Sequence, residues 1–247
     1  MKKICASLFV LGASVWAADF WQVKPFTDWS DKDVQKMLTN SPWAKSIGVN
    51  VSGPSAVTAG GSGSAPAGAG RGAGGVGQEG TPISEQGGRG GRGTLSPPDA
   101  PPDVVADVVL RWQSALPIKQ ALARLKYGAE AGSSAEAKEM LGRQDSNFVI
   151  VASGEPLRSM LRGNLEAVKA AVLGKTMLLR KGKNPIQPSD IQVNAAARSF
   201  EIYFAFPRTP EVTAEDKELE FVTKIGDLSL RSKFQLRSMM LNGKLEL

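Results

Sequence analysis

A short basic run between two predicted strands is the clearest candidate binding site in this sequence. It reads Arg180-Lys181-Gly182-Lys183, and a glycine inside such a run is typical of a turn. Cationic side chains at a turn bind a phosphate, an acidic glycan or an anionic lipid headgroup. The alternative is a solvated loop, because most charged side chains face water. Arg180, Lys181 and Lys183 are therefore predicted as a candidate anion-binding site.

An acidic run precedes the last predicted hairpin. Carboxylate clusters bind calcium, and a facing pair of carboxylates hydrolyses glycosidic bonds. This run lacks the ligand spacing and the central glycine of an EF-hand loop, and two of its members alternate with apolar residues as on the wet face of a strand. A structural role is favoured, and a carboxylate-based hydrolase stays as an alternative. The members of the run are Glu211, Glu215, Asp216, Glu218 and Glu220.

Two residue types that carry much of enzyme chemistry are almost missing. The chain has no histidine, and its single cysteine, Cys5, lies in the predicted export signal. Histidine is the usual proton shuttle near neutral pH and the commonest metal ligand, and cysteine is the usual thiolate nucleophile. A catalytic triad with histidine, a Cys-His dyad, a disulfide and an ordinary zinc site are thereby excluded. We expect a non-catalytic protein with no metal and no cofactor.

Residues 1–17 are typical of a signal peptide. Two lysines precede an apolar run from Ile4 to Trp16, and small residues follow it. We expect cleavage after Ala17 and a mature protein that is periplasmic or secreted; an uncleaved anchor or a buried helix is the alternative. The run is shorter than the roughly 20 apolar residues of a spanning helix, and no later segment is apolar for long enough to span a membrane.

Composition divides the rest of the chain into three parts. An aromatic-rich helical segment at 18–51 precedes a Gly/Pro/Ser-rich tract at 52–103, and a domain of ordinary composition spans 104–247. The tract has almost no large apolar residues to bury, so we expect a disordered linker. Its Gly-Arg-Gly repeats resemble segments that bind single-stranded nucleic acid, but interleaved aromatic residues are missing. Because the net charge also falls from +6 to +4 when Lys2 and Lys3 leave with the signal, we expect no nucleic-acid partner.

The segment at 18–51 is predicted to hold one helix. Ser30 is a suitable N-cap, and apolar residues follow it at helical spacing until Pro42. Trp21, Trp29 and Trp43 crowd this short stretch. They pack either on the C-terminal domain or on a partner, because aromatic side chains anchor many protein interfaces. Trp21, Trp29 and Trp43 are thus candidate partner-docking residues, with packing on the chain's own domain as the favoured alternative.

The domain at 104–247 is predicted to be α+β. Val104 to Trp112 alternates apolar and polar residues as in a half-buried strand, and a helix is expected from Pro117 to a stop at Gly128. Gly226-Asp227 suits a two-residue hairpin turn. Helices precede strands, which favours a mainly antiparallel sheet with helices on one face. Further helices are expected at 135–141 and 165–173, further strands at 148–151, 176–179, 191–193 and 200–206, and a final turn at Asn242-Gly243.

Several short motifs together resemble a group of uncharacterised exported proteins of soil bacteria whose function is unknown. The resemblance implies bacterial export and no activity, ligand or site residue. Together with the missing residue types, it favours a non-catalytic exported protein that contacts a protein or the cell envelope; an anionic-ligand module is the alternative. The motifs are Trp29-Ser30, Ser41-Pro42-Trp43-Ala44, Arg111-Trp112-Gln113-Ser114, Phe206-Pro207-Arg208, Lys233-Phe234-Gln235-Leu236 and Gly243-Lys244-Leu245-Glu246-Leu247.

Overall fold

The structure, a computed structural model, describes residues 19–50, 105–160, 165–196 and 199–247. All of these residues belong to one folding unit, so the segment before the tract folds together with the domain after it. The predicted signal at 1–17 and the predicted linker at 52–103 lie outside the described residues.

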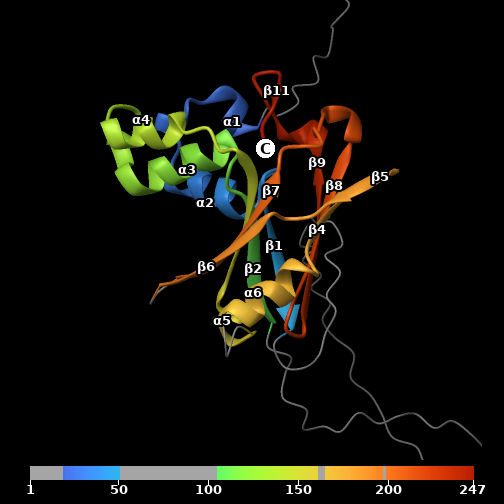
Figure 1. Cartoon of the computed structure of the whole chain (residues 1–247). Coiled ribbons are helices and arrows are strands. Elements are labelled where there is room, and N and C mark those ends of the chain that lie inside the picture. Colours follow the sequence, from blue (N-terminus) through green and yellow to red (C-terminus); the bar gives the residue numbers. More distant parts are fainter. Residues whose placement is uncertain (1–18, 51–104, 161–164, 197–198) are drawn as a thin grey trace, which may run out of the picture. The chain divides into compact units, whose positions relative to one another are not determined.

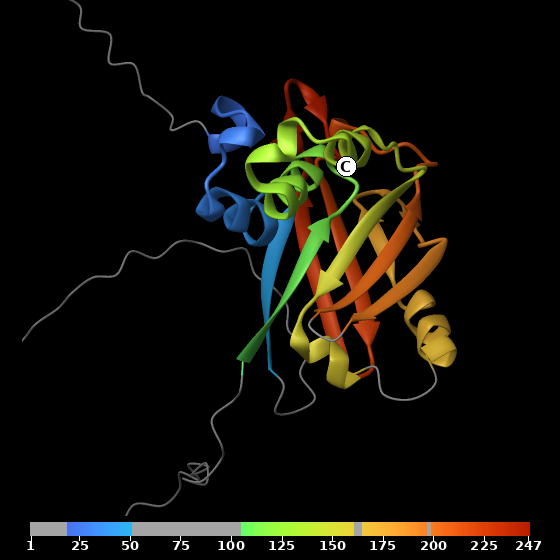
Figure 2. The same cartoon turned by 90° about the vertical axis from the view of Figure 1, so that its left-hand side faces the viewer.

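A five-stranded antiparallel sheet forms one half of the unit. Its strand order is β1-β2-β3-β7-β6, so β1 and β6 are its edges. Figure 2 shows β1 in blue beside β2 in green. The strands are β1 (Ala44–Asn50), β2 (Val105–Trp112), β3 (Asn147–Ser153), β7 (Ser199–Pro207) and β6 (Asp190–Ala196).

A four-stranded antiparallel sheet forms the other half, in the order β5-β4-β8-β9. Ile225 pairs with Leu228 across Gly226-Asp227, which confirms the predicted two-residue hairpin. A small additional hairpin of β10 (Met240–Leu241) and β11 (Lys244–Leu245) turns at Asn242-Gly243, also as predicted. The four strands are β4 (Met177–Arg180), β5 (Lys183–Ile186), β8 (Glu218–Ile225) and β9 (Leu228–Gln235).

The core lies between the two sheets. Every second residue of β8 and β9 is buried, which is the pattern of strands that face a core on one side. Aromatic rings from the two sheets meet edge to face, with centroids 5.1 Å apart for Phe204 and Phe221 and 5.7 Å apart for Trp112 and Phe234. Such pairs add about 0.5–1.5 kcal/mol each to the free energy gained from area burial.

The helices gather in two groups at opposite ends of the sheets (Figure 1). One group consists of α1 (Phe20–Val23), α2 (Asp31–Thr39), α3 (Leu116–Tyr127) and α4 (Ala135–Gly142). The other consists of α5 (Glu155–Met160) and α6 (Leu165–Leu173). Single 3-10 turns lie at Phe26–Asp28, Gly128–Gly132, Ala214–Asp216 and Leu236–Met239.

Local signals at the helix ends act as the sequence predicts. The Ser30 hydroxyl accepts a hydrogen bond from the Asp33 backbone N–H, and the Asp33 carboxylate accepts one from the Ser30 N–H, which forms a capping box. Helix α3 has Pro117 in its first turn and ends at Gly128. The backbone φ of Gly128 is +57°, a conformation that glycine adopts at little energetic cost because it has no Cβ atom. These caps fix where the segments before and after each helix leave it.

The predicted α+β class with antiparallel strands is confirmed, but the layout differs from the expectation in two ways. The described strands form two main sheets and a small hairpin where one sheet was expected, and the helices lie in two groups where one face was expected. The segment at 18–51 is also no separate part, because its β1 pairs with β2 along the whole strand, from Ala44 with Arg111 to Asn50 with Val105. The alternation in β1 is short and includes Lys45 and Gly48, so the sequence pattern did not mark it as a strand.

The three tryptophans of the N-terminal segment pack inside this unit. Trp29 is 2% exposed and Trp43 is not exposed at all, and Trp21 contacts Trp43 edge to face. The Trp43 indole N–H donates to the Glu246 carbonyl over 2.8 Å, which ties the N-terminal segment to the end of the chain. The hypothesis that Trp21, Trp29 and Trp43 anchor a partner does not fit this burial, because no ring is left at the surface to be covered.

Candidate functional site

The predicted basic turn lies between β4 and β5, and its first cation has a structural role. Arg180 is only 8% exposed. Its guanidinium donates to the Asn184 carbonyl through both Nε (3.2 Å) and Nη2 (3.0 Å), and to the Glu211 carbonyl at 3.5 Å. Arg180 therefore closes the turn and is not available to an anion.

The other two cations of the turn differ from each other. Lys183 makes an ion pair with Asp216 over 2.5 Å, and Lys181 is exposed at the tip of the turn. The structure thus does not bring Arg180, Lys181 and Lys183 together as an anion site, because two of them already bind groups of the chain itself.

The acidic run is dispersed over several local contacts. Glu218 pairs with Lys233, and Glu220 pairs with Arg231 on the outer face of the β8–β9 hairpin. Asp216 accepts from the Thr213 backbone N–H and closes a capping box. No group of three or more acidic side chains able to hold a metal ion occurs among the described residues.

Asp216 makes the stability of this region dependent on pH. Burial by itself opposes its ionisation, but the bond from Lys183, the bond from the Thr213 N–H and the charge of Arg180 together lower its pKa below the usual 3.8. A carboxylate with a lowered folded pKa stabilises the fold at pH values above its unfolded pKa, and this contribution is lost as the pH falls through the folded pKa.

Replacement Asp216→Asn is therefore expected to lower the free energy of unfolding by about 1–3 kcal/mol at pH 7. The loss should shrink as the pH falls through the lowered pKa, because the wild-type carboxylate is then protonated as well. Urea unfolding of both proteins at pH 7 and near pH 2.5 measures the difference, with the exposed Glu215→Gln as control. An equal difference at both pH values would contradict the role of the charge.

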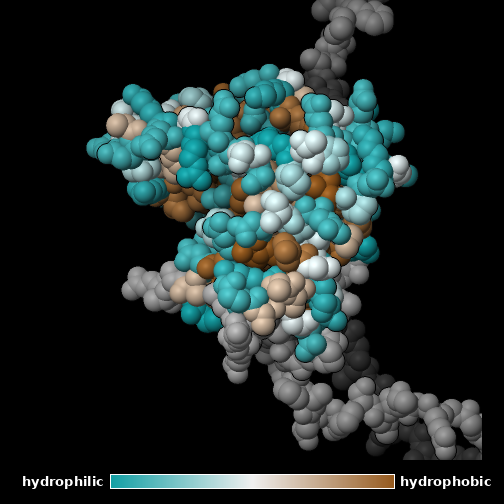
Figure 3. All heavy atoms as spheres, in the orientation of Figure 1, coloured by the Kyte–Doolittle hydropathy of each residue, from teal (hydrophilic) through white to brown (hydrophobic). Residues whose placement is uncertain are grey.

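A groove, rather than the basic turn, is the candidate site that the described residues form. It lies between helices α3 and α4 and the outer face of the five-stranded sheet, with a cavity volume of about 880 Å³. We call it the α3–α4 groove. Figure 3 shows the recess at the left, with hydrophobic surface on its helical side and hydrophilic surface around it. The helices and the loop after them supply Lys119, Lys126, Tyr127, Glu136, Glu139 and Arg143; the strands supply Asn147, Val149, Asp190, Gln192, Tyr203 and Ala205.

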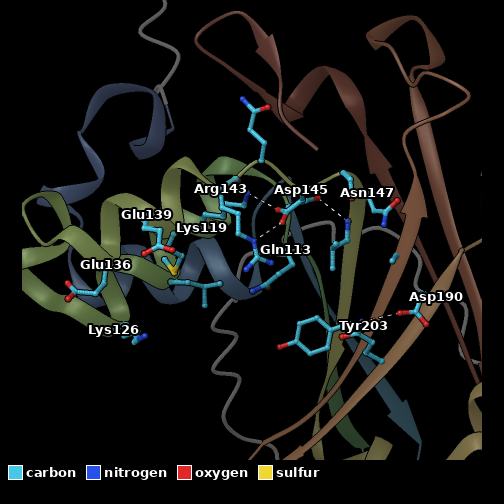
Figure 4. A pocket seen from close by; sticks show the side chains of 18 of the residues that line it. Gln113, Lys119, Lys126, Glu136, Glu139, Arg143, Asp145, Asn147, Asp190 and Tyr203 are labelled. Carbon is cyan, nitrogen blue, oxygen red and sulfur yellow. Dashed lines mark hydrogen bonds and ion pairs between the residues drawn. The ribbon is translucent and has the colours of Figure 1, made fainter.

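One end of the groove is built around Asp145 (Figure 4). Its carboxylate pairs with Lys119 of α3 over 2.8 Å and with Arg143 over 3.3 Å. Lys119 and Asp145 have side chains only 14% and 15% exposed, so water screens their pair less than a surface pair. The Lys119 ammonium also donates to the Arg143 carbonyl over 2.7 Å. The loop after α4 is thereby fixed against α3.

A second set of contacts holds the same loop from the other side. The Arg208 guanidinium lies 4.5 Å from the centre of the Phe148 ring, and its Nε donates to the Asp145 carbonyl over 3.0 Å. A further recess of about 920 Å³ lies on this side and shares Lys119, Arg143 and Asp145 with the groove. The loop therefore forms a fixed wall between two recesses.

Tyr203 on the floor of the groove belongs to a cross-strand network that extends to residues of β2 and β7 beside the groove. The Tyr203 hydroxyl donates to Glu201 over 2.7 Å, and the other oxygen of Glu201 accepts from Arg111 over 2.8 Å. Burial, followed by the hydrogen bond with Glu201 and the charge of that carboxylate, raises the pKa of Tyr203 to about 12. Tyr203 is thus a neutral phenol at physiological pH whose ring position is fixed by its neighbour.

Contacts within the chain limit the chemistry of two of the four carboxylates that line the groove. Asp145 is bound to two cations, and Asp190 accepts from the Ile191 backbone N–H and from the Gln192 side chain. A general acid or base needs a group free to exchange its proton with a substrate. The arrangement is suited to holding a ligand through a fixed polar surface.

Sequence reasoning missed this groove because its residues come from separate elements. Glu201 and Tyr203 alternate with the phenylalanines of β7, so their position on the outer face follows from the strand pattern. Nothing in the sequence shows that Lys119 and Asp145, far apart in the chain, meet over that face. The only feature of the sequence that points to the groove is its tyrosine content. The chain has two tyrosines, Tyr127 and Tyr203, and both line the groove.

None of the helices in the described ranges has the length and apolar character needed to cross a membrane. The chain matches no protein-family model, and no significant similarity connects it with a curated protein or a solved structure.

Proposed function

We propose that this chain is a non-catalytic exported protein that binds a protein or another component of the cell envelope through the α3–α4 groove. The observation that carries this proposal is a concave surface whose central charged groups already bind one another, as Lys119, Asp145 and Arg143 do. Such a surface is preorganised, because its side chains already hold their positions without a ligand. Binding therefore loses little side-chain conformational entropy.

The non-catalytic part of the proposal is supported by the residue types of the chain and by the contacts in the groove. The full sequence has no histidine. Asp145 and Asp190 bind neighbouring groups of the protein, and the Tyr203 phenol, with a pKa of about 12, is a poor base at neutral pH. The export part of the proposal rests on the signal-peptide pattern at 1–17.

A pull-down from a native envelope fraction tests the proposed function. We expect the mature wild-type chain to retain a specific component of the fraction. The Gln192→Arg variant should lose this component, because Gln192 is exposed on strand β6 at the edge of the groove and the longer, cationic arginine would occupy the space of the ligand. Lys181→Gln at the tip of the basic turn serves as the matched control and should retain the component. Loss with Lys181→Gln and not with Gln192→Arg would place the binding surface at the basic turn and refute the groove.

A further inference from the structure

We infer that the α3–α4 groove takes a neutral, hydroxyl-rich ligand, an envelope glycan without charged substituents. This inference rests on the proposed function and adds the chemical class of the ligand. Three properties of the groove carry it: the balance of its charges, the type of its hydrogen-bonding groups, and the position of its two tyrosines.

The charges of the groove nearly cancel. Three cations, Lys119, Lys126 and Arg143, line it together with four carboxylates. Two of the cations, Lys119 and Arg143, are paired with Asp145, whose single negative charge offsets one of their two positive charges, and the three cations and four carboxylates together carry a net charge of −1. A phosphorylated or sulfated ligand would meet these carboxylates without a free cationic cluster to bind it, which disfavours strongly anionic ligands. The four carboxylates are Glu136, Glu139, Asp145 and Asp190.

Side-chain amides are frequent around the groove. Gln113, Gln144, Asn147 and Gln192 all line it. A side-chain amide carries both donors and an acceptor, and a sugar hydroxyl likewise donates one hydrogen bond and accepts others. An array of amides therefore matches a row of hydroxyl groups, whereas an anionic ligand needs donors alone.

The tyrosines supply the apolar part of the site. Sugar rings have a face of C–H groups, and the negative face of an aromatic ring attracts such weakly positive hydrogens. The Tyr203 ring stands next to Val149 and Ala205 in the groove lining, and its hydroxyl is held by Glu201. Tyr127 lies on the helical side, where the Lys126 ammonium sits 4.9 Å from its ring centre. The described tryptophans, in contrast, are buried in the core.

The size of the groove agrees with a short oligosaccharide. Sites for small ligands commonly have volumes of about 300–1,000 Å³, and the groove has about 880 Å³. The residues that would touch the ligand come from helices α3 and α4, from the loop after α4 and from strands β3, β6 and β7.

Titration calorimetry with cellohexaose, chitohexaose and maltohexaose as neutral probes and hexagalacturonate as the anionic probe tests the inference. We expect the mature chain to bind at least one neutral probe, and to bind hexagalacturonate more weakly. Tyr203→Ala and Gln192→Arg should each weaken binding by about tenfold or more, the loss typical of an aromatic or polar anchor. Tyr203→Phe keeps the ring and should stay within about threefold of wild type. Gln187→Arg, an exposed glutamine outside the groove lining, is the matched control and should bind as wild type does.

Absence of binding to all three neutral probes, or tighter binding of hexagalacturonate, would overturn the inference. So would a Tyr203→Ala protein that folds and binds as wild type does. Retention of an envelope protein in the pull-down together with a failure in calorimetry would leave the proposed function standing and replace the glycan with a polypeptide ligand. Failure of the pull-down itself would refute the proposed function.

Discussion

A chain that lacks residues 1–50 is expected not to fold. The deletion removes β1, which pairs with β2 along its whole length, and it removes α2 with the buried Met37. It also removes Trp21, Trp29 and Trp43; burial of each ring is worth about 5 kcal/mol before ordering costs, from about 200 Å² at about 25 cal/mol per Å². The net stability of a domain is about 5–15 kcal/mol, so the loss exceeds what the remainder can tolerate.

Circular dichroism and amide NMR spectra of the truncated chain measure this outcome. A chain that lacks only residues 1–17 is the control and should unfold cooperatively. A synthetic peptide of residues 19–50, added to the truncated chain, should restore the folded spectrum, because strand β1 and the tryptophans then return without a covalent link. A truncated chain that melts cooperatively at an unchanged temperature would show that this segment is dispensable.

Trp43→Ala is expected to lower the free energy of unfolding by about 3–5 kcal/mol, the usual range for removal of a buried large aromatic side chain. Trp43 is fully buried, and its ring contacts Trp21 with centroids 5.9 Å apart. Its loss leaves a cavity and also leaves the Glu246 carbonyl without the indole N–H that now donates to it. Urea unfolding of the Trp43→Ala and wild-type chains, both without residues 1–17, measures the change.

Two other substitutions separate the causes of this effect. Trp43→Phe keeps an aromatic ring and loses only the hydrogen bond and part of the volume, so it should cost less than Trp43→Ala. Val23→Ala, at a side chain that is 62% exposed, should change the free energy of unfolding by less than about 0.5 kcal/mol. A Trp43→Ala protein as stable as Val23→Ala would contradict the burial seen in the structure.

Elements governed by neighbouring residues were predictable from the sequence, and elements governed by distant pairing were not. The Ser30 cap, the stop at Gly128 and the turn at Gly226-Asp227 depend on contacts within a few residues, and the structure has all three. Strand β1 depends on β2, which follows only after the tract, so its weak alternation gave no sufficient signal. Sequence periodicity reports which face of an element is buried, and not which other element covers it.

The residues of the candidate site were likewise not predictable from the sequence pattern alone. A run of cations such as Arg180 to Lys183 stands out in a sequence, but two of its three charges bind the Asn184 carbonyl and Asp216 once the turn has formed. Tyr203 does not stand out, and its position in the groove depends on helices α3 and α4 packing over the outer face of the sheet. Proximity of charges along the chain was therefore a poor guide to free binding groups.

The pairing of Asn50 with Val105 has a consequence for how the gene of this protein can change. These residues are cross-strand neighbours at the end of the β1–β2 pair where residues 51–104 join the two strands, so the chain between them begins and ends at almost the same point in space. Two strand ends this close require no minimum length of the chain that joins them, and loop-closure entropy in general rises by only about 0.6 kcal/mol for each doubling of loop length. A longer or moderately shorter connection at residues 51–104 is therefore expected to leave the register of the β1–β2 pair intact.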